Sequence, residues 1–336
     1  MSGLRQIFCQ ILRIASLCAL FVSASVSLPA TRDAHADKND LVLSRLGTIS
    51  GLGVVGSNAQ FRSLASELGV VMAPRLGEPA DTLGYGGFHF SADVGFTSIS
   101  NNASYWQVLE SSSGDLSGTH GNGAMQTTSL FVKKGLWLPL PSFEVGVGAV
   151  HLGESHLWAS QAYVKFALHE GYHDLPLPSL AVRGGASRMM GSDQIDLTVA
   201  SIDVSISKDF GVAGTFRLSP YAGWNWLIII PRSEVIDKTP HIDSRDVPAD
   251  VNMNFVFKDQ SDIYRNRFFM GTKLKYYIFT LTLEAEFALA GTSVDDRPGT
   301  DVNCLDINPM MPSSNCDATD AAGAQTTFTT SLGLDF

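Results

Sequence analysis

The sequence predicts an all-β protein: a transmembrane, antiparallel, up-and-down β-barrel of about ten strands. Three observations predict this fold. Apolar and polar residues alternate with a period of two in about ten segments between residues 83 and 336, which is the pattern of β-strands with two unlike faces. The long loops between these segments all fall on one side. No segment after residue 36 reaches the ~18–20 consecutive apolar residues that a membrane-spanning helix needs.

Composition narrows the class of protein further. The chain has 336 residues, of which 45% are hydrophobic and 17% charged, and this balance excludes a disordered chain. The formal net charge is −10, with 23 Lys and Arg against 33 Asp and Glu. Because so acidic a chain has no basic patch to spare, we expect no nucleic-acid partner.

Residues 1–36 are typical of a secretory signal peptide. Arg5 and Arg13 precede an uncharged run from residue 14 to residue 30, and Ala34-His35-Ala36 supplies a small-x-small cleavage site. An uncleaved membrane helix is the weaker alternative, because the run is short and is interrupted by Pro29. We therefore expect cleavage after Ala36 and export of the chain.

The expected strands each combine an apolar face with a polar or glycine face. The alternation slips phase near Ala200, which predicts a β-bulge there. The number of strands is ten, or twelve if residues 37–82 add a hairpin, and an even number returns the chain to the rim from which it started. The segments lie near residues 88–97, 126–138, 143–149, 158–168, 178–189, 194–208, 216–228, 268–275, 281–289 and 326–336.

Residues 37–82 contain one amphipathic helix, with Phe61, Leu64 and Leu68 on one face. The stretch before this helix, residues 51–56, fits the dinucleotide-binding pattern G-x-G-x-x-G. That site needs a βαβ unit with an acidic residue after its second strand, whereas Met72-Ala73-Pro74 and a loop follow here. We expect no cofactor, and we place 37–82 in the lumen or at the periplasmic mouth of the barrel as a plug.

A second motif, His169-Glu170-Gly171-Tyr172-His173, fits the zinc-protease pattern H-E-x-x-H. Both histidines reach one metal only if a helix carries them, because a helix places residues i and i+4 on the same face. The preceding residues alternate with the period of a strand, Gly171 interrupts the motif, and two prolines follow at 176 and 178. We expect a turn at the end of a strand and no metal.

The end of the chain resembles that of bacterial outer-membrane β-barrel proteins. Residues 326–336 alternate and end in Phe336, with apolar Leu334 and Leu332 at two-residue steps before it. In that superfamily such a strand is the signal read by the assembly machinery. The resemblance covers residues 83–336 and implies the outer membrane as location, with outer-membrane lipid and the assembly machinery as partners. The architecture of 37–82 also resembles that of the long-chain fatty-acid transporter group, in which an N-terminal segment plugs the barrel.

A ten-stranded barrel leaves little room inside, since eight strands are already filled by their own side chains. We therefore do not expect a general porin, although the barrel is porin-like in architecture. Two interpretations of the charged residues on the inward face stay open: an ion-pair network that closes the lumen, and a gated path for a small solute. The candidate lumen-facing residues are His89, Asp93, Glu144, Lys165, Arg183, Arg217, Lys273, Glu284 and Glu286.

We expect the protein to be a narrow or plugged channel for small or hydrophobic molecules and not an enzyme. A structural barrel that interacts through its extracellular loops is the alternative, and a membrane-embedded hydrolase is less well supported because the sequence offers no convincing nucleophile and base. After cleavage only Cys304 and Cys316 remain as cysteines, in the loop before the last strand. In an exported chain they predict one disulfide.

Overall fold

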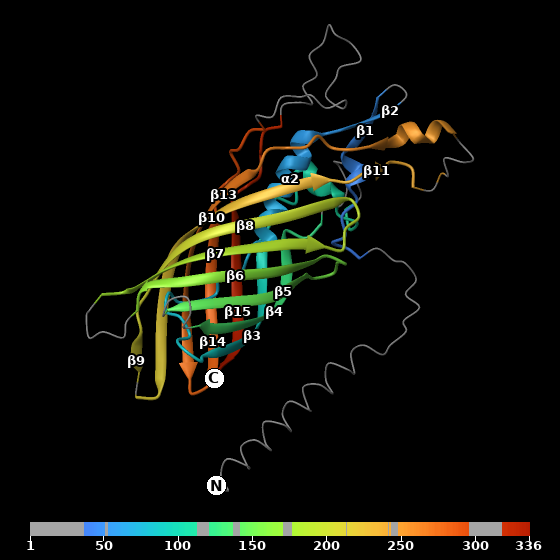
Figure 1. The fold of residues 1–336 in the computed structure, drawn as a ribbon. Coiled ribbons are helices and arrows are strands. Elements are labelled where there is room, and N and C mark those ends of the chain that lie inside the picture. Colours follow the sequence, from blue (N-terminus) through green and yellow to red (C-terminus); the bar gives the residue numbers. More distant parts are fainter. Residues whose placement is uncertain are drawn as a thin grey trace, which may run out of the picture. The chain divides into compact units, whose positions relative to one another are not determined.

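The computed structural model describes residues 37–50, 53–112, 121–136, 142–170, 177–212, 214–240, 242, 248–295 and 318–336. In these ranges ten strands pair antiparallel with their neighbours along the chain, and the last strand pairs with the first (Figure 1). The predicted antiparallel barrel of about ten strands, with one helix in the N-terminal segment, is confirmed. The strands are β3 (Phe88–Ser98), β4 (Ala124–Leu136), β5 (Phe143–Leu152), β6 (Trp158–His169), β7 (Ser179–Met190), β8 (Ile195–Ser207), β10 (Phe216–Ser233), β13 (Ile263–Tyr276), β14 (Phe279–Ala288) and β15 (Gln325–Asp335).

The two ends of the barrel differ. Phe88 and Phe336 exchange backbone hydrogen bonds of 3.1 and 2.8 Å at one end, which we call the terminal rim. The short turn at residues 277–278 and the strand β9 (Phe210–Val212), which extends the edge of β10, lie at this end. At the other end, which we call the loop rim, β3 and β10 end and β4 and β13 begin, and the described residues 99–112, 121–123, 234–240 and 248–262 of the long connections belong to this end.

The wall of the barrel is apolar outside and polar inside over much of its height. This is the reverse of a soluble barrel, because a soluble barrel encloses its apolar face. Strand β3 shows the pattern, with His89, Ser91 and Asp93 buried inside while Phe90 and Val94 are exposed outside. Large exposed hydrophobic side chains occur on all ten strands, among them Leu130, Val147, Trp158, Met190, Val204, Trp224, Met270, Leu283, Phe287, Phe328 and Leu332.

The helix α2 (Asn58–Val71) fills the half of the lumen nearest the loop rim. It packs against the inner faces of β8, β10 and β13 (Figure 1), and its Phe61, Leu64 and Leu68 are fully buried. The helix comes so close to β10 that a Cβ on Gly69 would lie 2.6 Å from Ile229 Cδ1. None of the described helices is long and apolar enough to cross a membrane.

The predicted bulge near Ala200 is wrong. Strand β8 pairs continuously with β7 and β10 through Ala200, and every odd-numbered residue from 195 to 207 faces inward. The apparent slip arises because Leu197 and Val199 face the apolar helix α2, whereas Asp203 and Ser205 face the polar half of the lumen. The register shift in this region of the wall lies instead at Ala167–His169 in β6.

The G-x-G-x-x-G stretch takes part in a β-hairpin. The strands β1 (Gly47–Ser50) and β2 (Gly53–Gly56) pair only with each other, so they add no strand to the barrel and the count is ten. Phe255 and Phe257 pack on the hairpin, and a Cβ at Gly47 or Gly56 would lie 2.7–2.8 Å from their rings. These glycines therefore permit close packing. The remaining short elements are η1 (Leu43–Leu46), η2 (Ser104–Val108), β11 (Ile236–Asp237), η3 (Pro248–Met253) and β12 (Asn254–Phe255).

The assignment of the outer face can be tested by placing an arginine on it. Val147 and Leu283 face outward and are 58% and 48% exposed. We expect Val147→Arg or Leu283→Arg to lower the free energy of unfolding in lipid vesicles by about 2–4 kcal/mol, because the charge must enter the hydrocarbon. Tyr277→Arg at the terminal rim is the control, with an expected cost of about 0–1 kcal/mol. Equal stability of all three variants would contradict the assignment.

Candidate functional site

The half of the lumen nearest the terminal rim holds residues 72–83, which lack regular secondary structure and follow α2. Side chains of the wall bind the backbone of this segment along its length. Gln161 Nε2 donates to the carbonyl of Ala73 at 3.0 Å, and Arg183 donates to that of Leu76 at 2.7 Å. The backbone N–H groups are bound in turn by Glu284 at Gly77 (3.0 Å), Ser207 at Ala80 (3.0 Å), Glu170 at Thr82 (2.9 Å) and Glu144 at Leu83 (3.0 Å).

Glu78 is the centre of a buried ion-pair cluster. Its carboxylate lies 2.7 Å from Lys133 Nζ and 3.1 Å from Lys165 Nζ. Lys165 also lies 3.1 Å from Glu144, and the Tyr163 hydroxyl donates to Glu144 at 2.8 Å. Because one partner lies in the plug and the others lie in β4, β5 and β6, the cluster ties the plug to the wall.

Two further pairs extend this network around the lumen. Arg183 pairs with Asp203 at 2.9 Å, and Arg267 pairs with Glu286 at 2.6 Å. Arg267 also donates to the carbonyl of Pro74 at 3.1 Å. The buried cations therefore serve both the wall carboxylates and the plug backbone, so their charges are compensated inside the barrel.

Eight of the nine lumen-facing candidates lie in the interior. Glu144, Lys165, Arg183, Glu284 and Glu286 belong to the network described above. Three lie elsewhere: Asp93 accepts from Ser129 at 3.1 Å, His89 bonds Asp335, and Lys273 lies 3.4 Å from Asp335. Arg217 lies at the terminal rim, where it is 63% exposed and lies 3.5 Å from Asp209.

Several interior residues were not among these candidates. Lys133, Asp203 and Arg267 face inward on strands whose alternation could have revealed them, given the correct phase. Glu78 could not be found in this way, because the segment around it has no periodicity. Its partners become apparent only when the lumen is closed around it.

The described side chains leave little free space around the plug. A cavity of about 20 Å³ lies beside Arg75 and Tyr163 in the middle of the lumen, which is room for about one water molecule. A wider pocket of about 170 Å³ opens at the terminal rim between Asp81, Lys273 and Asp335. A solute entering this pocket meets the Glu78 cluster.

The H-E-x-x-H motif does not begin in a helix. His169 is the last residue of strand β6, and Glu170 accepts hydrogen bonds from Thr82 N at 2.9 Å and Ser142 Oγ at 2.6 Å. His173 lies outside the described residues. Glu170 therefore holds the plug and the neighbouring turn, a structural role that the sequence pattern did not suggest.

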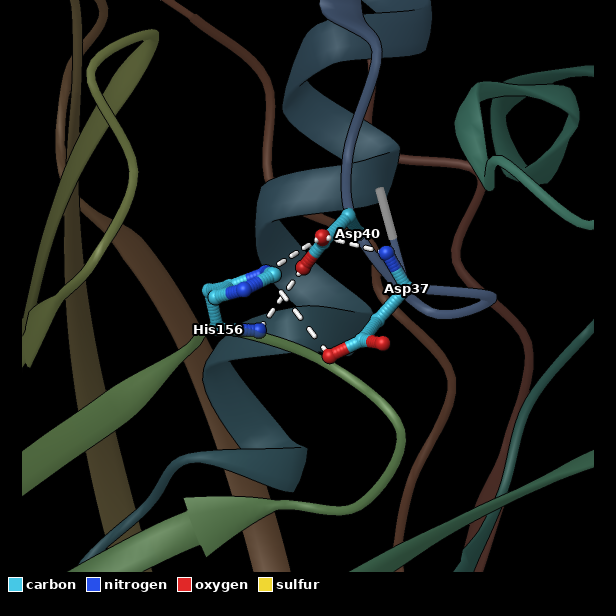
Figure 2. A group of neighbouring side chains, drawn as sticks. All are labelled: Asp37, Asp40 and His156. Carbon is cyan, nitrogen blue, oxygen red and sulfur yellow. Dashed lines mark hydrogen bonds and ion pairs between the residues drawn. The ribbon is translucent and has the colours of Figure 1, made fainter. Parts of the chain in front are cut away.

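The described chain begins at the loop rim, where Asp37, Asp40 and His156 form a cluster (Figure 2). His156 donates from its backbone N to Asp40 at 2.8 Å, and its Nδ1 lies 2.7 Å from the Asp40 carboxylate and 3.8 Å from Asp37. Among the described residues these three side chains are near enough to share a cation. The contacts already present bind the turn at 37–40 to the turn before β6.

This cluster predicts a pH dependence. Burial alone would raise the pKa of Asp40, but the hydrogen bonds from His156 and from the Asp37 backbone lower it below its ordinary value. A carboxyl whose pKa is lower in the folded state stabilises that state above the unfolded pKa of about 3.9, and the contribution is lost as the pH falls through the folded pKa. We expect protease cleavage after Lys38 to accelerate below about pH 4, measured by mass spectrometry with an acid-active protease. Asp40→Asn should abolish this change, and an unaltered pH profile in that variant would contradict the assignment.

Cys304 and Cys316 lie outside the described residues, so their disulfide stays a prediction. We expect mass spectrometry of the non-reduced protein to show a linked peptide pair, because no other cysteine remains after cleavage at Ala36. The short closed loop should change the stability of the barrel little, since the constraint acts on the loop. Labelling of both thiols in the native membrane would contradict the prediction.

No protein-family model matches the sequence, and no curated protein sequence matches it. Solved structures with a similar arrangement include OmpT, an outer membrane protein of Vibrio cholerae, with 11% identity, a TM-score of 0.25 and coverage of 63% of this chain and 56% of that one. This chain thus spans little more than half the length of that protein.

Two other solved structures match most of their own length. The outer membrane protease OmpT from Escherichia coli has 9% identity, a TM-score of 0.30 and coverage of 75% of this chain and 96% of that one. The outer membrane protein OprG from Pseudomonas aeruginosa has 12% identity, a TM-score of 0.29 and coverage of 77% and 99%. At these identities and TM-scores the likeness carries no conclusion about the activity of this chain.

Proposed function

We propose that this protein is an outer-membrane barrel that acts as a plugged channel, closed at rest by α2 and residues 72–83 and opened when they move. The observation that carries the proposal is the division of the lumen. Near the loop rim the wall packs on α2 mainly through apolar side chains, with Arg265 donating to Ser66 at 2.7 Å, whereas near the terminal rim it carries buried ions that bind the plug backbone. With the plug displaced, this half of the wall would be a hydrophilic path.

The outer surface supports the location. Exposed apolar side chains cover the outside of every strand, and a soluble protein rarely carries so large an apolar surface. Leu332, Leu334 and Phe336 end the last strand, and Leu332 and Phe336 are exposed. We propose that they form the assembly signal and that lipid and the assembly machinery are partners. Small or hydrophobic molecules are the proposed cargo: the ion-lined half of the lumen favours small polar ones, and the fatty-acid transporter resemblance implies hydrophobic ones.

We also propose that the protein is not an enzyme. The buried acids and bases of the lumen contact one another or the plug backbone, which leaves them no substrate-facing role in the closed state. The proposal is thus one of passage controlled by the plug.

Conductance in planar lipid bilayers tests the channel. We expect the refolded wild-type protein to be closed with rare openings, and a variant lacking residues 37–83 to conduct steadily. Ala80 N lies 3.0 Å from Ser207 Oγ, so Ala80→Cys with Ser207→Cys, in a background with Cys304→Ser and Cys316→Ser, can lock the plug. Openings should vanish in the oxidised form and return on reduction.

Two results would contradict this function. A deletion variant that is folded, as judged by heat-modifiable gel mobility, but silent would favour a structural barrel. Steady conductance through the locked form would show that the plug is not the gate.

The alternative, a surface-interaction barrel, is favoured by the folded cap at the loop rim, where Phe61 stacks on Phe257 with ring centroids 4.4 Å apart. If the protein is a surface-interaction barrel, replacement of residues 248–257 by a flexible linker should impair binding at the cell surface and leave bilayer conductance unchanged.

A further inference from the structure

The path of the chain through the barrel has a consequence for its assembly. Residues 37–50 and 53–56 lie at the loop rim, α2 and residues 72–83 occupy the lumen, and the chain enters the wall at the terminal rim as β3 (Figure 1). The N-terminal segment and the first strand therefore lie at opposite ends of the barrel, joined by a chain inside it.

The segment is fastened at the loop rim by contacts from several connections. Asn39 N donates to the carbonyl of Glu154 at 2.8 Å, and Asn39 Nδ2 donates to that of Gly153 at 2.8 Å. Val42 N donates to Val108 O at 2.8 Å, and Leu43 N donates to Gln194 Oε1 at 2.7 Å. The Asp37–Asp40–His156 cluster adds to this set (Figure 2). The segment is thus integrated with the connections of the loop rim.

We propose that the barrel delivers its own N-terminal segment to the cell surface, so that residues 37–56, and any peptide attached before them, are displayed outside. This rests on the proposed outer-membrane function, in which the long loops face outward. An exported chain reaches the barrel from the periplasm. Residues 37–56 must therefore pass to the far rim while the following residues stay in the lumen.

The lumen sets the form in which the segment passes. Beside residues 72–83 the described part of this half holds a cavity of about 20 Å³ and the pocket of about 170 Å³ at the terminal rim, and neither could admit a folded hairpin. The β1–β2 hairpin forms a sheet of its own, separate from the barrel wall, and Phe255 and Phe257 pack on it. We infer that the segment passes unfolded and that the cap folds after it emerges.

Thiol labelling of intact cells tests the display. Lys38 and Glu154, with side chains 67% and 52% exposed, lie at the loop rim, and Tyr277, 70% exposed, lies at the terminal rim. Each is replaced singly by cysteine in a background with Cys304→Ser and Cys316→Ser. With a membrane-impermeant maleimide, Lys38→Cys should be labelled in intact cells as fully as Glu154→Cys, and Tyr277→Cys only after the outer membrane is permeabilised.

The outcomes separate the two proposals. Labelling of Glu154→Cys in intact cells, with Lys38→Cys protected until permeabilisation, overturns the display and leaves the outer-membrane barrel standing. Labelling of Tyr277→Cys alone in intact cells, or of none of the three, overturns the proposed orientation or location and the display with it.

A second experiment tests passage in the unfolded form. A short epitope inserted between Ala36 and Asp37 should be accessible to antibody on intact cells. A loop that a disulfide can close, inserted at the same place, should block display in cells that have the periplasmic thiol oxidase. In cells without the oxidase the loop stays open, and display should return. The same loop inserted at 277–278 should not change the display of the N-terminal segment in either kind of cell. Equal display of the closed loop in both cells would overturn this passage.

Discussion

Replacing Lys165 by methionine is expected to lower the free energy of unfolding by about 3–5 kcal/mol. Lys165 is buried and is the cation paired with Glu144 among the described ion pairs, and it shares Glu78 with Lys133. Methionine keeps much of the volume but leaves the Glu144 carboxylate inside the barrel without an ion-pair partner. The loss of a buried charge partner costs more than the pair itself contributes, because desolvation of the remaining ion is no longer offset.

Denaturant unfolding in lipid vesicles measures this effect. Lys38→Met is the matched control, since Lys38 pairs with Glu154 at 3.2 Å but both side chains are largely exposed, and we expect a change of about 0–1 kcal/mol. Glu144→Gln added to Lys165→Met removes the unpaired charge and should recover part of the loss. A Lys165→Met protein as stable as the control would mean that the cluster is hydrated and does not hold the plug.

The barrel wall could be predicted from the sequence because its constraint is local. Each strand has one face on the outside of the barrel and one on the lumen, so alternate residues such as Phe90 and Ser91 face different surroundings and the period of two appears in the sequence. The rule fails where the surroundings change along one face. Val199 and Asp203 both face inward, Val199 toward α2 and Asp203 toward the polar half of the lumen. The inward face therefore changes from apolar to polar along the strand, and in the sequence this change resembles the phase shift of a β-bulge.

The plug contacts could not be predicted because they are not periodic. Glu78 meets Lys133 and Lys165 only after a chain of irregular backbone has been threaded through the lumen. The alternation predicts that Arg217 lies in the lumen. It is on the predicted face of its strand, but it lies at the exposed terminal rim and not in the interior. Alternation reports the face of a strand on which a residue lies and not its depth in the barrel.

The second large effect is expected at Glu67, the buried carboxylate that joins α2 to the loop rim. It accepts hydrogen bonds from the Tyr105 hydroxyl and Trp106 Nε1, both at 2.7 Å, and from the backbone N–H groups of Ser100 and Gly323, both at 2.9 Å. One side chain thereby binds two segments that are distant in sequence, residues 100–106 and Gly323, to the helix α2. Glu67→Leu keeps the helix propensity of the position but leaves four donors without their acceptor, two in buried hydrogen bonds and two in part-buried ones.

An unsatisfied buried donor costs about 1–3 kcal/mol, so we expect Glu67→Leu to lower the free energy of unfolding by at least about 3 kcal/mol, even if water reaches some of the donors. Glu67→Gln should lie between this variant and the wild type, because it retains one oxygen acceptor. Gln60→Ala is the control on the same helix: it removes a single hydrogen bond to Ser104 and should cost about 1 kcal/mol.

Since Glu67 fixes the helix and not the wall, amide exchange in α2 of the Glu67→Leu variant should accelerate more than exchange in β5 and β6, and openings in bilayers should become more frequent. Uniform acceleration in helix and strands would show instead that the helix is part of the barrel's folding core and cannot move independently as a plug.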